Sequence, residues 1–503
     1  MMRPPLIPSH AARTLLAPVA LATVLLAGCA LQTPPCTVQA PPPSQWFAPL
    51  PPAGLAGAGV ADASLPHNGR LTDLTQWWQQ QGDPLLVELI ASAQAVSPSI
   101  ASARSRIEQA RATRVAAGAA LGPTLDGSAS ITRSRSQPMA PGASPLSTTA
   151  QAGLNASWEI DVFGGRRAAS NAATERMAGA EAQWHDARVS VAAEVANQYY
   201  SLRTCRELET ITRADAASRQ ETARLTDLSM KAGFTAPATA ALARASAAEA
   251  SARATDQAAR CELDVKALVA LSSLQEPDLK QKLALSQVIP VQVAPIFIAS
   301  VPAETLAQRP DVFNAAREVA AASDEIGSAE ADRYPRLGLA GSVGRSQVRS
   351  GGVSSDFTTW AIGPLSLTVP LFDGGRRAAD VDAARARYDD AAAVYRASVR
   401  QAVREVEEAL VNLQSTAARG IDTQTAVEGY RASFNGTEAL YKNGLASLVE
   451  LEDARRTLLT AQTTLASLQQ SRNAAWVSLY RAMGGGWTPD AISVSTSAPA
   501  AAR

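Results

Sequence analysis

Histidine and cysteine side chains carry much of the metal and nucleophilic chemistry of proteins, and this chain of 503 residues has only three histidines and four cysteines. His10 lies in an N-terminal leader, so a zinc site or a histidine-based triad would have to be built around His67 or His185 alone. No constellation of paired acids suggests a catalytic cleft either. We therefore expect no metal, no cofactor and no enzymatic activity.

The N-terminal residues indicate an export signal. An apolar run over 15–27 is too short to span a bilayer as a helix but has the length of a signal-peptide core. It ends in Leu-Ala-Gly before Cys29, as at the cleavage and acylation site of bacterial lipoproteins. The alternative is an ordinary signal peptide followed by a chance cysteine. Ala30, where aspartate would be a retention signal, indicates the outer membrane. We predict a signal peptide over 1–28 and a lipid anchor on Cys29.

Two further cysteines are placed symmetrically about a glycine. Cys205 and Cys261 each lie 28 residues from Gly233, so they would face each other in an antiparallel hairpin that turns there. In the oxidising periplasm we predict a disulfide between them. The alternative is that both are small buried apolar residues. Cys36 is left without an assigned role.

Two Gly-Gly-Arg-Arg motifs, at 164–167 and 374–377, could be mistaken for phosphate-binding loops, but neither has the spacing of a P-loop. Each directly follows a predicted strand. The glycines are expected to allow a sharp turn from strand into helix; they are Gly164, Gly165, Gly374 and Gly375.

The charge balance excludes an electrostatic case for nucleic-acid binding. Lysine plus arginine and aspartate plus glutamate number 46 each, so the formal net charge is zero, whereas a nucleic-acid interface needs a basic face. Beyond the leader no apolar run is long enough for a transmembrane helix. Residues 29–70 are rich in proline, alanine and glycine and are predicted to form an extended tether.

The rest of the chain is a duplication. The Gly-Gly-Arg-Arg motif recurs at an offset of 210 residues, and Gly233 recurs as Gly444 at an offset of 211. We divide the chain into a first repeat, a linker, a second repeat and a flexible tail, each repeat comprising a helix, two strands and a long helical hairpin; their bounds are 71–275, 276–300, 301–487 and 488–503.

The predicted strands alternate between apolar and polar residues. In the first repeat the apolar positions are Leu154, Ala156, Trp158 and Ile160, and in the second they are Leu365, Leu367, Val369 and Leu371. This period of two suits a membrane barrel wall with one lipid face and one water face. A half-buried sheet of a soluble protein is the alternative. Two serine- and glycine-rich segments, 135–147 and 345–358, are predicted loops.

Two long segments without proline, 151–236 and 371–487, carry apolar residues at alternating steps of three and four. This pattern is typical of coiled-coil packing. A helix from Arg166 to Lys231 would be about 100 Å long. Four strands cannot close a barrel, because the smallest membrane barrels have about eight and open edges in lipid leave backbone groups unpaired. Several copies are therefore expected to share one barrel continued by a helical tunnel.

The chain resembles the TolC-like outer-membrane efflux proteins, in particular their NodT-type lipoprotein branch. The resemblance covers nearly the whole mature chain. It rests on the lipoprotein cleavage site before Cys29 (the lipobox) and on several motifs that follow one another in the order typical of the family. These motifs are Trp77-Trp78, Gly82-Asp83-Pro84-Leu85-Leu86, Arg309-Pro310-Asp311-Val312, Tyr334-Pro335-Arg336-Leu337, Leu371-Phe372-Asp373-Gly374-Gly375 and Met483-Gly484-Gly485-Gly486-Trp487. It implies an α+β membrane protein, a homotrimer with a twelve-stranded barrel of four strands per chain and a coiled-coil tunnel. It also implies docking to a periplasmic adaptor (membrane fusion) protein and an inner-membrane pump of the RND type, for export of drugs and other small molecules.

The resemblance further implies a gate where the tunnel narrows at its periplasmic tip. Tyr441 and Asp453 match the family's gate aromatic and aspartate, and Glu450 lies close by. Three symmetry-related carboxylates at a narrow point would attract cations and repel anions. The alternative is that these acids only stabilise the N-terminal turn of an exposed helix. The adaptor is expected to dock at the two tips, around Gly233 and Gly444.

Two other functions are open at this stage. One is the duct of a protein-secretion system, which the wall residues do not distinguish from a drug-efflux duct. The other is a periplasmic coiled-coil scaffold lipoprotein without a pore. A scaffold has no need of amphipathic strands, so the strands favour a duct.

Overall fold

The computed structural model describes the greater part of the mature chain, namely residues 33–48, 77–135, 146–286, 306 and 308–487. The predicted signal peptide over 1–28, the acylation site Cys29 and the tail 488–503 lie outside the described residues.

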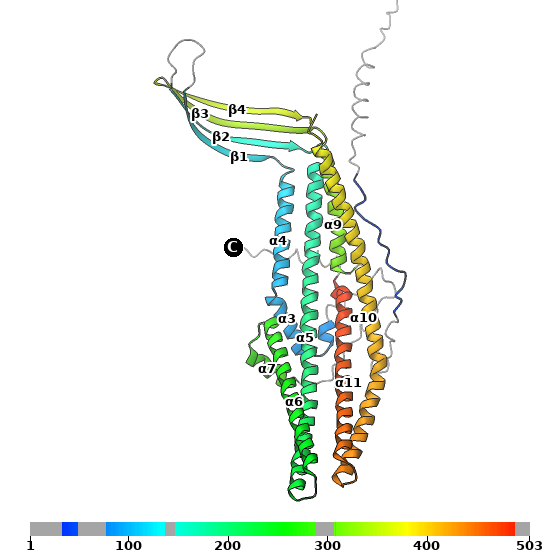
Figure 1. The fold of residues 1–503 in the computed structure, drawn as a ribbon. Helices are drawn as coiled ribbons and strands as arrows, with labels where there is room; N and C mark the ends of the chain where they lie inside the picture. The colour runs from blue at the N-terminus through cyan, green and yellow to red at the C-terminus, as the bar shows by residue number, and fades with distance from the viewer. Residues whose placement is uncertain (1–32, 49–76, 136–145, 287–305, 307, 488–503) are drawn as a thin grey trace, which may run out of the picture. The chain divides into compact units, whose positions relative to one another are not determined.

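Four long strands form one antiparallel sheet in chain order (Figure 1): β1 (Thr124–Arg135), β2 (Leu146–Ile160), β3 (Arg336–Ser350) and β4 (Val353–Thr368). Each repeat contributes one pair, and β2 of the first repeat pairs with β3 of the second. Trp158 lies opposite Leu339, so the apolar residues of the two repeats share one face. In the described chain β1 and β4 each have a single neighbouring strand.

A bulge preserves this apolar face in β4. Ile362 lies opposite Gly341 and Leu365 opposite Leu339, so β4 advances three residues where β3 advances two. The extra residue falls at Gly363-Pro364, where a missing backbone N–H is tolerated. The apolar side chains thus stay on one face although they change from even to odd positions. Large apolar side chains exposed on the strands include Leu125, Ile131, Leu154, Trp158, Val343, Trp360, Ile362, Leu365 and Leu367.

The predicted loop over 345–358 is wrong. Strands β3 and β4 continue through this segment to a two-residue turn at Gly351 and Gly352, whose φ angles are 58° and 89°. Positive φ at both central residues is what a tight hairpin turn of matching twist requires. The serine- and glycine-rich composition conceals a regular hairpin. In the other predicted loop, residues 136–145 lie outside the described chain.

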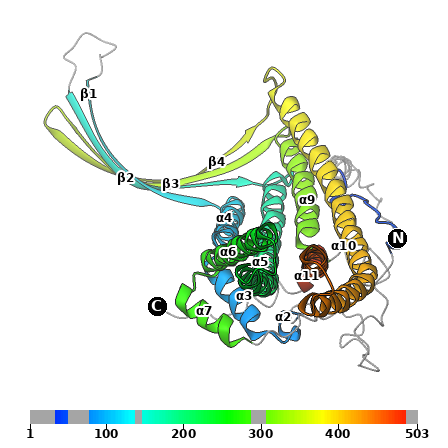
Figure 2. The same ribbon diagram turned by 60° about the horizontal axis from the view of Figure 1, so that its bottom comes forward.

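Each repeat supplies one shorter helix before its strands and two long helices after them. In the first repeat these are α4 (Pro98–Ala119), α5 (Gly165–Lys231) and α6 (Pro237–Ser272); in the second they are α9 (Pro310–Ala331), α10 (Arg376–Lys442) and α11 (Leu448–Ala482). Helices α5 and α6 lie side by side, as do α10 and α11 (Figure 2). Among the described helices none alone is long and apolar enough to cross a bilayer, and only α3 (Pro84–Val96) with α4, bent by 49°, passes that test as a pair.

The turns from strand into helix use glycine for two different reasons. Gly164, Gly374 and Gly375 have φ angles of 82°, 66° and 92°, which residues with a Cβ rarely adopt. Gly165 instead allows close packing, because a Cβ there would lie 2.6 Å from the Cβ of Ala331. An aspartate completes each turn: Asp161 accepts from the backbone N–H groups of 166 and 167, and Asp373 from those of 375 and 377.

The described chain falls into two compact units that cut across the repeats, with boundaries inside the helices α4, α5, α9 and α10. The first unit holds the sheet and the adjoining helix ends. There Arg176 of α5 donates to Glu318 and Glu325 of α9, at 2.8 and 2.5 Å. The segment before residue 40 also contacts this unit, since Ser323 and Tyr388 donate hydroxyl hydrogen bonds to the carbonyls of residues 34 and 35.

The second unit contains the main apolar core. The largest fully buried side chains of this core include Trp77, Leu86, Leu89, Tyr199, Leu202, Leu268, Leu279, Leu410, Leu479 and Met483. The tether prediction over 29–70 is incomplete, because Trp46 is buried in this core and the backbone N–H groups of 47 and 48 donate to Glu407 at 2.7 Å. The predicted linker over 276–300 begins with a helix, α7 (Glu276–Leu285), which buries Leu279. Shorter elements are α2 (Trp77–Gln80) and η2 (Gly484–Gly486).

Candidate functional site

The two long hairpins end in turns of the same design. Gly233 and Gly444 have φ angles of 85° and 75°, and each is followed by a residue whose N–H donates to a carbonyl five residues earlier, at 2.9 Å in both cases. This left-handed glycine closes the helix by satisfying carbonyls that have no partner within it. The residues that follow, Phe234 and Leu445, are 86% and 74% exposed. Both tips therefore present a large apolar side chain to solvent.

The helices that return from the tips begin differently. Helix α11 starts with a capping box, in which Glu450 N–H donates to the Ser447 hydroxyl and Ser447 N–H donates to the Glu450 carboxylate at 2.6 Å. The hydrogen bond from the Ser447 backbone lowers the pKa of Glu450. Helix α6 starts after Ala236, which has no side-chain cap, with Pro237 at its first position. Glu450 thus serves its own helix end in this chain.

The other two predicted gate residues have different surroundings. Asp453 is exposed and pairs with Arg456, three residues along the same helix. Tyr441 reaches the other hairpin, where its hydroxyl lies 3.1 Å from the hydroxyl of Thr226 on α5. Tyr441 also packs against a small apolar cluster drawn from both hairpins, made of Ala223, Ala243, Ala247, Leu448 and Leu451. Of the three, only Tyr441 contacts the first hairpin through a described interaction.

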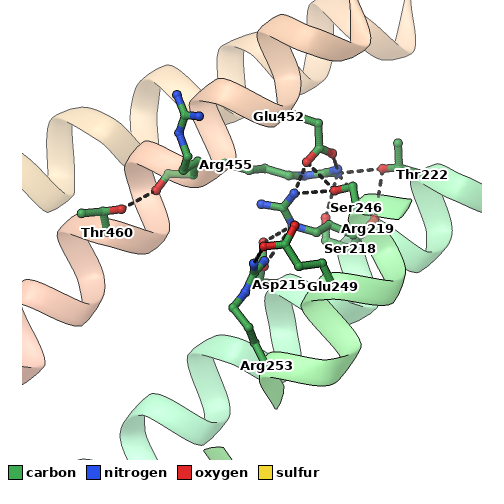
Figure 3. A network of polar contacts seen from close by, with 11 residues as sticks. Asp215, Ser218, Arg219, Thr222, Ser246, Glu249, Arg253, Glu452, Arg455 and Thr460 are labelled. Carbon is green, nitrogen blue, oxygen red and sulfur yellow. Dashed lines mark hydrogen bonds and ion pairs between the residues drawn. The ribbon is translucent and has the colours of Figure 1, made fainter. Parts of the chain in front are cut away.

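A network of charged side chains lies next to this cluster and joins the hairpins more directly (Figure 3). Glu452 of α11 forms an ion pair with Arg219 of α5 and accepts a hydrogen bond from Ser246 of α6 at 2.7 Å. Arg219 also pairs with Asp215 one turn earlier, through two contacts of 3.0 Å. We call this network, together with Arg455, the hairpin bridge.

Arg455 is the second cation of the hairpin bridge, and it is 4% exposed. Its guanidinium donates to the hydroxyls of Ser218 and Thr222 on α5, at 2.9 and 2.8 Å, and to Glu452 at 3.0 Å. It also lies 5.7 Å from the ring centre of Phe434 on α10. Arg455 of α11 therefore contacts two other helices, α5 and α10.

The electrostatics of the hairpin bridge make it sensitive to the loss of one member. Arg219 and Arg455 are balanced by Asp215 and Glu452, so the buried charges sum to zero. Removing one partner of a buried pair leaves the other uncompensated in a poorly solvated site, at a cost of about 3–5 kcal/mol for full burial. The bridge thus holds the hairpins in one arrangement and would weaken sharply once a member is neutralised.

Arg219, Arg455 and Glu452 are not among the gate residues predicted from the sequence. A signal is present: Arg455 follows Leu448 and Leu451 at the coiled-coil steps of three and four. An arginine at a seam position must be paired when the seam is buried.

The two cysteines of the first hairpin are joined. Cys205 of α5 and Cys261 of α6 form a disulfide with a Cα–Cα distance of 5.5 Å, inside the main core. The amide of Gln257 donates to the Cys205 sulfur at 3.1 Å. Cys36 is a free, exposed thiol 3.8 Å from the Ser323 hydroxyl. Over the described part of the chain, no three histidine, cysteine, aspartate or glutamate side chains are grouped to hold a metal ion.

Sequence comparisons identify relatives of known type. The family model described as "Outer membrane efflux protein" matches residues 89–273 and 301–485, one match in each repeat. The toluene efflux pump outer membrane protein TtgI of Pseudomonas putida is 30% identical over 472 residues, which cover 93% of this chain and 97% of that protein. Nodulation protein T of Rhizobium leguminosarum bv. viciae is 30% identical over 424 residues, or 82% of this chain and 85% of that protein.

A solved structure shares the fold. The crystal structure of the CmeC outer membrane channel of Campylobacter jejuni aligns with a TM-score of 0.75, covering 89% of this chain and 98% of that one, at 23% sequence identity.

Proposed function

The chain belongs to the outer membrane efflux protein family, and we propose that it is the exit duct of a tripartite pump. It is an outer-membrane efflux channel rather than an enzyme. The observation that carries the proposal is the sheet: most of its large exposed apolar side chains lie on one face, and its edge strands each have one neighbour in the described chain. Such a sheet is stable in lipid only if its edges are paired by other copies.

Three copies in a ring would supply twelve strands from four per chain, above the minimum of about eight for a membrane barrel. The apolar face then contacts lipid, and the serine- and threonine-rich face lines the pore. The long hairpins continue the barrel as a periplasmic tunnel. In a scaffold without a pore, the exposed apolar side chains of Trp360 and Ile362 would face water instead of lipid.

The partners follow from the same assignment. A periplasmic adaptor docks at the tips around Gly233 and Gly444, where Phe234 and Leu445 are exposed, and an inner-membrane pump of the RND type supplies the energy. Relatives are named for toluene efflux and for pyoverdine export, so we propose small organic molecules as cargo rather than secreted proteins. Acylation of Cys29 anchors the chain in the outer membrane.

The hairpin bridge forms the closed state of the tunnel. It joins α11 to α5 and α6, while Tyr441 joins α10 to α5 through Thr226. Opening then requires the Arg219–Glu452 pair to separate. Asp453, together with Glu450, supplies the negative charge at the narrow end, and Asp453 is available for this because it is exposed.

Single-channel conductance in a planar bilayer tests the duct. The purified protein is expected to give a small, cation-selective conductance, and Asp453→Ala is expected to increase the conductance and reduce the selectivity. The matched control is Asp422→Ala on α10, an exposed acid farther from the tip. A well-folded sample that never conducts would refute the duct, and equal conductance of both variants and wild type would remove Asp453 from the gate.

A further inference from the structure

The arginines in the outer half of the sheet, the end farthest from the strand-to-helix turns, all lie on one face. They are Arg133 and Arg135 on β1 and Arg345 and Arg349 on β3. Arg133 and Arg349 flank Thr148 of β2 in one row. Arg345 lies two positions beyond Val343, which is opposite Trp360. Because side chains alternate between faces along a strand, all four arginines share the apolar face. The other face carries small hydroxyl side chains at this level, including Thr132, Ser134, Ser346 and Ser350.

The surroundings of these arginines contain almost no negative charge. Segments 127–158 and 337–372 together hold four arginines, no lysine and a single acid, Asp356. Asp356 pairs with Arg345 at 3.3 Å. Arg133, Arg135 and Arg349 are exposed and form no ion pair within the part of the chain that the structure describes. We call these three residues the arginine cluster.

The position of each arginine along its strand explains which one is paired. Arg345 and Arg349 lie eight and twelve residues beyond Leu337, where the apolar face of β3 begins. At about 3.3 Å per residue and a tilt of about 40°, these steps correspond to about 20 and about 30 Å along the bilayer normal. The apolar band of an outer-membrane barrel is about 25 Å tall. Arg345 therefore lies toward the outer edge of the band, where a charge needs a partner, and the arginine cluster lies beyond it, at the headgroups of the outer leaflet.

We propose that the arginine cluster binds the phosphate groups of the phosphorylated glycolipid that forms the outer leaflet. Arg133 and Arg349 are separated by one strand, so their Cα atoms are about 10 Å apart, and Arg135 is about 7 Å farther along β1. Three long side chains at these spacings can converge on one headgroup. The planar guanidinium fits phosphate through two parallel hydrogen bonds. This proposal rests on the outer-membrane duct proposed above.

A hollow on the same face favours a glycolipid over an ordinary phospholipid. Its lining includes three small side chains, Ala129, Ala150 and Ala152, and three polar ones, Arg345, Gln347 and Asp356. These six residues occupy the two rows next to the arginine cluster on the side of the apolar band. The alanines leave room for a bulky headgroup, and the polar groups can form hydrogen bonds with sugar hydroxyls. A phospholipid with one phosphate and no sugar would use only part of this surface.

Native mass spectrometry of the detergent-purified oligomer tests the site, with diphosphoryl lipid A as the probe. The double variant Arg133→Gln with Arg349→Gln removes two charges and keeps polar side chains. We expect it to bind lipid A at least about tenfold more weakly than wild type. The matched control adds Thr132→Arg and Val348→Arg to the double variant, which restores the net charge on the water-lined face. Its binding is expected to stay weak.

Wild-type protein alone provides a second test, which does not depend on the folding of any variant. It is titrated with phosphatidylglycerol and with inorganic pyrophosphate, and lipid A is expected to bind more tightly than either. Equal affinity for phosphatidylglycerol would reduce the site to a general anionic-lipid surface. Displacement of lipid A by equimolar pyrophosphate would assign the site to free phosphate. Either result would overturn the proposal, as would equal binding of lipid A by wild type and the double variant or recovered binding in the control.

The outcomes separate this proposal from the proposed function. Oligomeric state and bilayer conductance are measured on the same samples, and the double variant is expected to conduct as wild type does, because its arginines face lipid and not the pore. Conducting oligomers without a preference for lipid A would overturn the site and leave the duct intact. A monomeric wild-type sample without conductance would overturn both.

Discussion

Glu452 of α11 and Arg219 of α5 form an ion pair between hairpins that belong to different repeats. The two residues are 233 positions apart in the sequence, yet they are the most direct polar link between the hairpins. Because Ser246 of α6 donates to the same carboxylate at 2.7 Å, one side chain ties α11 to both helices of the first hairpin. Glu452, and not the more exposed acids near it, is therefore the residue whose charge controls the contact.

Neutralising Glu452 should favour the open tunnel. Glu452→Gln leaves Arg219 with Asp215 alone, and we expect the closed contact to lose about 1–3 kcal/mol once solvent access to the carboxylate is allowed for. The measurement is single-channel conductance, which should rise or show longer openings. Glu249→Gln removes an exposed acid of the same neighbourhood and should leave the conductance unchanged. Identical traces from Glu452→Gln and wild type would contradict a closing role for the bridge.

The elements of this fold could be predicted from sequence because their periods are unambiguous. Alternation of two around Leu154 and steps of three and four along the long helices give strands and coiled coils directly. The hairpin tips follow from the repeated glycines Gly233 and Gly444. In the segment 345–358 the alternation is masked by serine and glycine, so a strand pair with a tight turn was mistaken for a loop.

The hairpin bridge could not be predicted in the same way. Tyr441, Glu450 and Asp453 lie at the tip by sequence proximity, and their position follows from the turn. Which acid reaches the other hairpin depends on the rotation of α11 about its axis. That rotation directs Glu452 to Arg219 and directs Asp453 to solvent and Arg456. Consecutive side chains of a helix point in directions about 100° apart. The packing of α11 against its neighbours therefore determines which acid faces the other hairpin.

The disulfide should stabilise the first hairpin. Cys205 and Cys261 are separated by 56 residues, and closing a loop of that length is worth roughly 2–4 kcal/mol by restricting the unfolded chain. We expect the double variant Cys205→Ser with Cys261→Ser to unfold at a lower temperature than wild type, as followed by circular dichroism in detergent. Cys36→Ser, which removes the free thiol, should have no such effect. An unchanged midpoint in the double variant would mean that packing alone holds α5 to α6.

Acid should destabilise the second unit through His185. Burial, with a smaller contribution from Arg188, lowers the pKa of His185 from 6.5 to about 4. Between these values the unfolded chain binds more protons than the folded one, so the free energy of unfolding falls as the pH is lowered through this window. The effect is on the order of 1–2 kcal/mol, because solvent still reaches part of the ring.

The measurement is the thermal midpoint of wild type and His185→Gln at pH 7 and pH 5. The drop on acidification should be smaller in the variant. Burial raises the pKa of the neighbouring Asp186, which acts in the opposite direction, so the comparison between the two proteins, and not the wild-type curve alone, isolates the histidine. Equal drops in both proteins would show that His185 titrates normally in the folded chain.

A charge on the apolar face of β4 should prevent insertion. Ile362 is 84% exposed and shares its face with Trp360 and Leu365. An arginine on the lipid face costs about 2–4 kcal/mol near the middle of the bilayer, and a threefold ring would carry this cost three times. We therefore expect Ile362→Arg to reduce the amount of detergent-resistant oligomer in outer membranes severely, as measured by unheated gel electrophoresis. Ala361→Arg places the same charge on the opposite, water-lined face and should assemble normally. A third variant, Leu365→Arg, tests the bulge at Gly363-Pro364 and should fail to assemble as Ile362→Arg does. If Leu365→Arg is tolerated while Ile362→Arg is not, the two residues are on different faces and the register assigned to β4 is wrong.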